Sequence, residues 1–369
     1  MKTVILGAGM TGLAAGIKTG ALIYEASDKP GGICRSYYQG GYRFENGGGH
    51  WIFGADDDIM PFIQKYCSIN EHSRDAGIYF NQIFPYPIQN IKNLKETYCA
   101  NSFKEWLQIR FGDTLCGMFF WPFNKKYTAG FYDDVLQDDP AKSPRNGTGY
   151  NDTFVYPQGG LDAMVDKMAE KQNIHYSKKA IKIDSEGRVV TFSDGEVVHY
   201  DRLISTIPLK QTLKLMGKYE NDLPHTSVLV LNIGAERGPR CPKEHWLYIP
   251  DPATPFYRVG FYSNVDPSFA PAGKVGLYVE RAFDGYADPA DHYSYAREVI
   301  QTLTDWGWIK YADVINASWI PYGYTWLKSG SRREEKLAYL KSVGIDSIGR
   351  YGAWRFCGIS ESILQGLSA

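Results

Sequence analysis

The stretch GAGMTG at residues 7–12 has the glycine spacing of loops that bind a dinucleotide between a strand and a helix. Gly7 permits the tight turn, Gly9 lets the backbone approach a pyrophosphate, and Gly12 allows the helix to pack closely against the strand. The residues expected to face the phosphates, at the positive end of the helix, are Gly7, Gly9, Met10, Thr11 and Gly12. A glycine-rich turn that binds no ligand is the alternative.

Glu25 ends the next apolar run, ALIYE. A carboxylate at this distance from the loop can accept hydrogen bonds from the ribose of an adenosine. Another apolar run, at residues 4–6, precedes the loop, so strand, loop, helix and acid follow in the order that such a site requires. The N-terminal sequence therefore predicts a Rossmann-like α/β unit that holds a dinucleotide.

Composition limits what kind of protein this is. The 369 residues suffice for two or three packed domains around a large cofactor. Forty basic and forty-one acidic residues give a net charge of −1, which argues against a nucleic acid as partner. Six cysteines form no CxxC pair, so we expect neither a metal site nor a disulfide framework. No apolar stretch has membrane-spanning length and the chain enters the nucleotide unit at once, so we expect a cytoplasmic protein without a membrane span.

Helical and strand patterns alternate along the chain. Helices are expected in most of 57–120 and at 160–171, 291–306 and 360–367, whereas 121–160 is expected to be rich in loops. Short β runs with EG and DG turns fill 174–207, and SVLVLNIGA and KVGLYVERAF are the clearest later strands. We therefore predict an α/β fold in which a nucleotide domain is assembled from residues 1–60, 161–215 and 335–369. A mainly helical insertion would occupy 61–160, and a β-rich substrate domain 216–334.

Four motifs in order resemble those of flavin-dependent enzymes related to amine oxidase, protoporphyrinogen oxidase and UDP-galactopyranose mutase. They are GAGMTG with Glu25, PGGICRSYYQGGYRFENGGGHWIFG at 30–54, YDRLISTIP at 200–208, and SIGRYGAWRFCGISESILQG at 347–366. The resemblance covers the half of the chain that binds FAD, and it implies FAD as the cofactor. Gly32 can present an amide to the diphosphate, and Arg35 can offer it a permanent charge.

The same resemblance places further residues at the cofactor. Gly49 and His50 would lie beside the flavin, with His50 adjusting the flavin and its access. Gly349 and Arg350 resemble the segment that holds the ribityl phosphate end. The last helix, opening around Gly358, Ile359 and Ser360, can direct its positive end at a flavin carbonyl.

Several segments are similar to the mutase branch of these enzymes. IPYGYTW at 320–326 resembles the segment that places a tyrosine near the nucleotide-sugar phosphates, and FYRVGF at 256–261 resembles the one that carries a diphosphate-binding arginine. PFNKKYTAG at 122–130 resembles a turn of the mutases' substrate domain, and YPQGGLDAMVDKM at 156–168 resembles their strand-to-helix step. The catalytic residues implied are His50, Arg258 and Tyr324. The substrate residues implied are Phe123, Asn124, Lys126, Tyr156, Arg258, Tyr324 and Phe356.

Other positions depart from the mutase pattern. Thr128 stands where mutases have a tryptophan near the base, an arginine expected near residue 152 is missing, and Phe356 and Gly358 replace a tyrosine and an acidic residue. The resemblance implies that N5 of reduced FAD attacks the anomeric carbon of a nucleotide sugar, as in the biosynthesis of cell-surface polysaccharides. The sequence does not decide whether the protein forms a homodimer.

Because of these departures, other classes of function are also considered. An FAD-dependent oxidoreductase that takes hydride from a small substrate is the main alternative. A non-catalytic FAD-binding scaffold is a weaker alternative, and so is an NAD-dependent dehydrogenase.

Overall fold

The computed structural model describes residues 2–54, 58–86, 102–135, 152–218, 221–285 and 291–369. The nucleotide half is built on a five-stranded sheet in which every neighbouring pair is parallel. Its strands, in order across the sheet, are β19 (Ile345–Ser347), β13 (Arg202–Ser205), β1 (Thr3–Leu6), β2 (Leu22–Tyr24) and β9 (Ile174–His175). The predicted assembly of this sheet from distant parts of the chain is confirmed.

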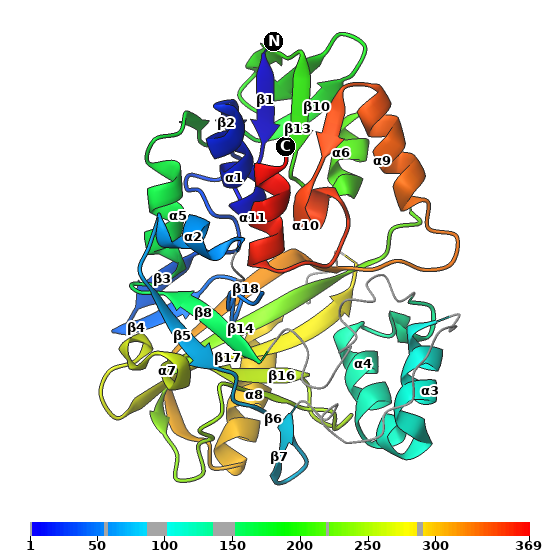
Figure 1. Cartoon of the computed structure of the whole chain (residues 1–369). Helices are drawn as coiled ribbons and strands as arrows, with labels where there is room; N and C mark the ends of the chain where they lie inside the picture. Colours follow the sequence, from blue (N-terminus) through cyan, green and yellow to red (C-terminus); the bar gives the residue numbers. More distant parts are fainter. Residues whose placement is uncertain (1, 55–57, 87–101, 136–151, 219–220, 286–290) are drawn as a thin grey trace.

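Helices cover the parallel sheet, as Figure 1 shows. α1 (Met10–Thr19) follows β1 directly and packs against the last helix, α11 (Ile359–Leu367). A side chain at Gly366 would meet the carbonyl oxygen of Thr11 at 2.4 Å, so the two helices touch backbone to backbone there. Also in this half lie α5 (Leu161–Ala169), α6 (Leu209–Leu215), α9 (Arg333–Ser342), α10 (Gly349–Gly352) and the small sheet of β10 (Ala180–Asp184), β11 (Val189–Phe192) and β12 (Val197–His199).

The second half is a seven-stranded sheet dominated by long antiparallel strands. Its strands, in order, are β18 (Ile309–Thr325), β14 (His225–Arg237), β17 (Lys274–Asp284), β16 (Arg258–Phe261), β15 (Trp246–Tyr248), β6 (Ala76–Tyr79) and β7 (Ile83–Tyr86). Alternate residues of β14 face opposite sides: Leu229 and Leu231 pack in the core beneath α8 (His292–Asp305), whereas Val228 and Val230 pack toward the nucleotide half. The sheet therefore separates two cores.

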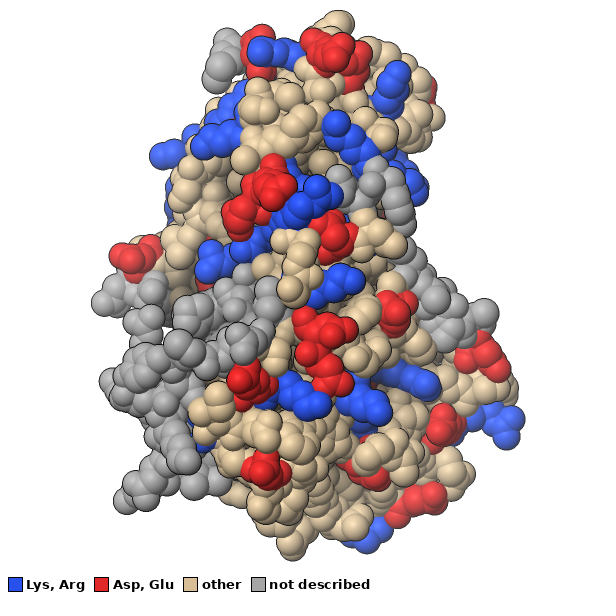
Figure 2. Space-filling model, turned by 90° about the vertical axis from the view of Figure 1, so that its right-hand side faces the viewer, with Lys and Arg blue, Asp and Glu red and all other residues tan. Residues whose placement is uncertain are grey.

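Between the halves lie the hairpin β3 (Ser36–Gln39) and β4 (Tyr42–Glu45), the pair β5 (Ile69–Ser73) and β8 (Thr153–Pro157), and short α2 (Met60–Gln64) and α7 (Tyr262–Val265). A helical lobe stands to one side (Figure 1). It contains α3 (Phe103–Leu115), a π-helical turn (Cys116–Phe120) and α4 (Trp121–Tyr127). On the surface shown in Figure 2, basic and acidic side chains are intermixed, without a large patch of one sign.

Two predictions of local structure are wrong. Residues 69–86 form β5, β6 and β7 instead of continuing a helical pattern, because β6 extends the large sheet by pairing in parallel with β15. Residues 121–127 form α4 within the segment expected to be loops. The strands and helices expected at 174–207, 227–235, 274–283, 291–306 and 360–367 are confirmed. The division into domains stays a prediction.

Candidate active site

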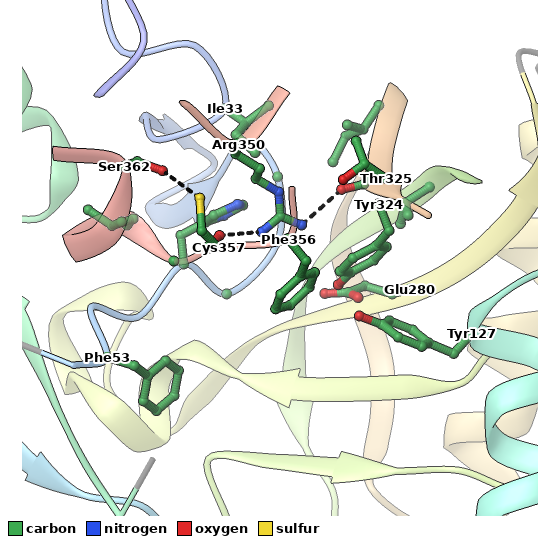
Figure 3. A pocket seen from close by; sticks show the side chains of 18 of the residues that line it. Ile33, Phe53, Tyr127, Glu280, Tyr324, Thr325, Arg350, Phe356, Cys357 and Ser362 are labelled. Carbon is green, nitrogen blue, oxygen red and sulfur yellow. Dashed lines mark hydrogen bonds between the residues drawn. The ribbon is translucent and has the colours of Figure 1, made fainter. Parts of the chain in front are cut away.

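A cavity of about 970 Å³ runs from the glycine loop to the helical lobe (Figure 3). The structure brings together, along its lining, most of the residues singled out in the sequence: Gly7, Gly9, Met10, Thr11, Gly32, Gly49, His50, Phe123, Asn124, Arg258, Tyr324, Arg350, Phe356, Gly358, Ile359 and Ser360. Six lie outside the lining: Gly12, Glu25, Arg35, Lys126, Tyr156 and Gly349.

The glycine loop forms an open cradle. A side chain at Gly9 would meet nothing within 4 Å, and one at Gly32 would meet only the Cα of Gly9, at 3.7 Å. Gly9 is also the N-cap of α1, where no side chain caps the free amides of the first turn. Open space, uncapped amides and a positive helix end together fit the pyrophosphate of a dinucleotide. The residues present therefore fit the flavin dinucleotide that the sequence implies.

Gly12 acts through packing. A Cβ there would stand 1.9 Å from the carbonyl oxygen of Gly7, so only glycine lets α1 start this close to β1. Gly349 has φ +83° and faces the side chain of Thr11 at a distance that leaves no room for a Cβ. Both glycines bring elements together behind the cradle rather than lining it.

Glu25 and Arg35 already have protein partners. The Glu25 carboxylate accepts from the amide of Ala8 at 2.6 Å and from the amide and hydroxyl of Ser27 at 2.9 and 2.7 Å. A carboxylate has about four lone-pair directions, so one remains for a ribose hydroxyl. Arg35 instead forms a 2.7 Å ion pair with Asp166 on α5, on the outer side of the cradle. Its charge is compensated there, so the structure gives no contact between Arg35 and the cavity.

The glycines at 47–49 make room for polar side chains. A Cβ would lie 2.4 Å from the His50 ring at Gly47, 2.8 Å from the Glu280 carboxylate at Gly48, and 2.3 Å from the Tyr278 hydroxyl at Gly49. Burial lowers the pKa of His50 to about 4, so the imidazole is neutral near pH 7. Its Nδ1 lies 2.9 Å from the carbonyl oxygen of Gly48, which can only accept, so Nδ1 carries the proton and Nε2 is left as an acceptor.

Arg258 and Glu280 form the central ion pair of the site. One Arg258 amino group donates to both Glu280 oxygens, at 2.7 and 2.6 Å, and lies 3.2 Å from the Tyr324 hydroxyl. Tyr257 donates a further hydrogen bond of 2.5 Å to Glu280, whose side chain is 2% exposed. Burial alone would lower the pKa of Arg258, but Glu280 and the surrounding tyrosines raise it well above its ordinary value. Arg258 therefore stays charged, and both Glu280 oxygens are occupied by protein donors.

Arg350 supplies a second positive charge, shown in Figure 3 beside Tyr324 and Phe356. Its guanidinium donates to the carbonyl oxygens of Cys357 and Gly323 at 2.8 and 3.0 Å. The guanidinium carbon lies 5.3 Å from the centre of the Tyr324 ring and 4.6 Å from that of Phe356. The buried Nε atoms of Arg258 and Arg350 have no hydrogen-bond partner within the described residues. Both guanidinium groups are held by the protein beside the cavity that they line.

Rings from the helical lobe close the cavity opposite Arg350. Tyr127 packs edge-on against Tyr324, with ring centres 4.6 Å apart, and Phe123 stacks on Tyr127 at 5.6 Å. Asn124 donates to the carbonyl oxygen of Phe120 at 2.7 Å, so its amide is partly occupied. Thr128 is fully buried and bonded to the carbonyl oxygen of Asn124, outside the lining. Phe123 and Tyr127 are therefore the aromatic residues of α4 that line the cavity.

Two residues predicted to bind substrate lie outside the cavity lining and are bonded to other parts of the fold. Lys126 donates to the carbonyl oxygens of Ile249 and Asp251, each at 2.8 Å, and thereby ties α4 to the loop after β15. Tyr156 is buried and hydrogen-bonded to the Glu45 carboxylate; it is not part of the cavity lining, and its ring packs edge-on behind Trp51, which is.

Four further residues line the cavity although the sequence patterns did not single them out: Glu280, Tyr257, Tyr278 and Tyr127. Glu280 had one usable signal, because a single glutamate in the apolar strand KVGLYVERAF requires a buried partner. The tyrosines had none, since the chain contains 27 of them.

Two further features of the described residues concern metal binding and membrane spans. Within the described ranges, no group of three or more His, Cys, Asp or Glu side chains gathers as a metal-binding set. Among the helices of the same ranges, none is long and apolar enough to cross a membrane.

Comparison with known proteins places this site in context. The model of the family described as flavin containing amine oxidoreductase matches residues 11–85 and 82–306. A crystal structure of reduced UDP-galactopyranose mutase is similar over 99% of this chain and 92% of its own, with 27% identity and a TM-score of 0.86.

Two more distant structures share the fold. A fatty acid isomerase from P. acnes is 16% identical, with a TM-score of 0.73 over 100% of this chain and 97% of its own. A double mutant of putrescine oxidase is 15% identical, with a TM-score of 0.68 over 100% and 97%.

Proposed function

The chain belongs to the family of flavin containing amine oxidoreductases, and from that premise we propose that it is a mutase that interconverts the pyranose and furanose forms of a nucleotide sugar. One observation carries the proposal: Arg258 and Arg350 flank Tyr324 within the cavity that also contains the cradle for a dinucleotide. The likeness to the mutase at 27% identity supports it.

The charge of the site favours an anionic substrate. Three arginines line the cavity (Arg74, Arg258, Arg350) against two glutamates (Glu280, Glu361), and His50 is neutral near pH 7, so the lining carries a formal net charge of about +1. A nucleotide diphosphate matches that charge, and phosphate oxygens are good partners for guanidinium groups. An amine substrate would be a cation beside two arginines, and Glu280, the carboxylate nearest to them, already accepts from Arg258 and Tyr257. The arrangement therefore opposes an amine as substrate.

Each residue has a role in the proposed reaction. When bound, reduced flavin would supply the nucleophilic nitrogen that attacks the anomeric carbon. Arg258 and Arg350 bind the diphosphate and neutralise the charge that it gains as it leaves, while Tyr324 donates a hydrogen bond to it. His50, neutral and anchored to Gly48, adds no competing charge.

The cradle residues hold the cofactor in the same proposal. The amides around Gly9 and Gly32 bind the pyrophosphate, and the free lone pair of Glu25 accepts from the ribose. Arg350, Gly358, Ile359 and Ser360 line the cavity at the start of α11, where the helix end is positive.

The test is to incubate the purified yellow protein with UDP-, dTDP- and GDP-sugars, with and without dithionite, and to separate the products by chromatography. We expect a ring isomer of unchanged mass that forms only after reduction of the flavin. An oxidised product, together with flavin reduction in the absence of dithionite, would instead establish the oxidoreductase alternative.

A further inference from the structure

A second crevice, of about 490 Å³, lies between β18 and the β3–β4 hairpin. Gly32, Ile33, Ile320 and Pro321 line both this crevice and the main cavity. The two spaces therefore adjoin along these four residues, and the proposed reaction uses none of the other five residues that line the crevice.

The floor of the crevice is held in place by hydrogen bonds. The Tyr37 hydroxyl accepts from the side-chain amide of Asn232 at 3.0 Å and is also hydrogen-bonded to Ser318. Asn232 is fully buried, and it in turn accepts from the Tyr262 hydroxyl at 2.8 Å and donates to the carbonyl oxygen of Glu45 at 2.9 Å. Such a saturated network keeps Tyr37 and Ser318 in one arrangement.

Asn46 and Asn316 provide the open polar groups. Both line the crevice and are half-buried, and within the described part of the chain neither side-chain amide has a hydrogen-bond partner. A carboxamide offers two donors and an acceptor with two lone pairs. Asn316 comes from β18 and Asn46 directly follows β4, so the two amides reach the crevice from two different elements.

The chemistry of the lining selects the ligand class. The crevice contains no charged side chain among its nine lining residues, so it offers no counter-charge to a phosphate, a carboxylate or an amine. Hydroxyl groups donate and accept at once, as carboxamides do, and neighbouring hydroxyls suit an amide on each side. The volume falls within the range of small-molecule pockets.

We propose that this crevice is a second binding site, which takes a neutral, hydroxyl-rich molecule of about the size of one monosaccharide unit. Asn46 and Asn316 bind its hydroxyls, and Tyr37 and Ser318 form the fixed floor. Because Ile33 and Ile320 line both spaces, a ligand in the crevice contacts residues that also line the main cavity.

The experiment uses oxidised, flavin-bound protein and methyl glycosides of galactose, glucose and fucose as probes. Saturation-transfer NMR and calorimetry measure binding without turnover, so a failed mutase assay leaves this test intact. We expect millimolar affinity for at least one glycoside, and a loss of about tenfold or more in Asn46→Ala and in Asn316→Val. Asn173→Ala, at an exposed position beside β9, is the control and should bind as the unaltered protein does.

Two further measurements separate the sites and the folding effects. Arg258→Ala changes the main cavity and should leave glycoside binding unchanged in folded protein, and the flavin absorbance of this variant and of each asparagine variant reports that it is folded. Absence of binding by all three glycosides overturns the proposal. So does binding that survives both asparagine substitutions, or binding that Arg258→Ala abolishes, because the sugar would then occupy the main cavity.

Discussion

Removal of Arg258 should reveal two separable effects, because this side chain both compensates a buried carboxylate and faces the cavity. In Arg258→Ala, Glu280, whose side chain is 2% exposed in the parent protein, loses the one ion-pair partner that it has among the described residues. Breaking a buried ion pair in this way costs about 3–5 kcal/mol of unfolding free energy. The second effect is on ligand binding, where a lost charge-assisted hydrogen bond to a diphosphate costs about 1.5–3 kcal/mol, or about 10- to 150-fold in Kd.

The double variant Arg258→Ala/Glu280→Gln distinguishes the two. Glutamine has no charge to leave uncompensated and can still accept from Tyr257, so most of the lost stability should return. The weakened affinity should not return, because the positive charge is still absent. Urea unfolding of the flavin-bound proteins measures the first quantity, and calorimetry with UDP, dTDP and GDP measures the second.

Two results would refute the reasoning. If the single variant unfolds at the same urea concentration as the parent protein, the Arg258–Glu280 pair does not compensate a buried charge. If the double variant binds every nucleotide as tightly as the parent protein, Arg258 does not contact the diphosphate. Retained flavin absorbance in both variants is the control for an intact cofactor site.

Three further predictions test other parts of the site. Gly9→Ala should fold with nearly unchanged stability but lose the flavin, because its methyl group enters the open space of the cradle. Gly12→Ala should instead be destabilised by about 3 kcal/mol or more, because its methyl group clashes with Gly7. Flavin absorbance and thermal unfolding of the two variants measure this difference. Burial lowers the pKa of His50 to about 4, so between pH 6.5 and 4 the unfolded chain binds more protons than the folded protein does. The unfolding free energy should therefore fall as the pH drops through this window, and it should fall less in His50→Asn. If urea unfolding gives the same dependence of stability on pH for both proteins, His50 is not neutral in the folded state. Lys126→Met should lower the unfolding free energy by about 1–3 kcal/mol, because two hydrogen bonds to backbone carbonyl groups are lost, and should leave nucleotide affinity unchanged. If the variant binds nucleotides more weakly, Lys126 belongs to the substrate site.

The sequence by itself determined the parts of the protein that local chain geometry dictates. Gly7, Gly9 and Gly12 lie within six residues, so their turn and helix start follow from backbone sterics, and the structure places them as expected. The long strands at 225–237 and 274–284 follow equally from their own apolar patterns.

Tertiary structure decided which side chains meet. Lys126, Tyr127 and Thr128 are consecutive, but each residue turns a helix by about 100°, so only Tyr127 reaches the cavity while its neighbours bond elsewhere. Arg258 and Glu280 face each other only because β16 and β17 pair in one antiparallel register. Register and helix rotation are set by contacts between distant segments, and the linear sequence carries no direct record of them.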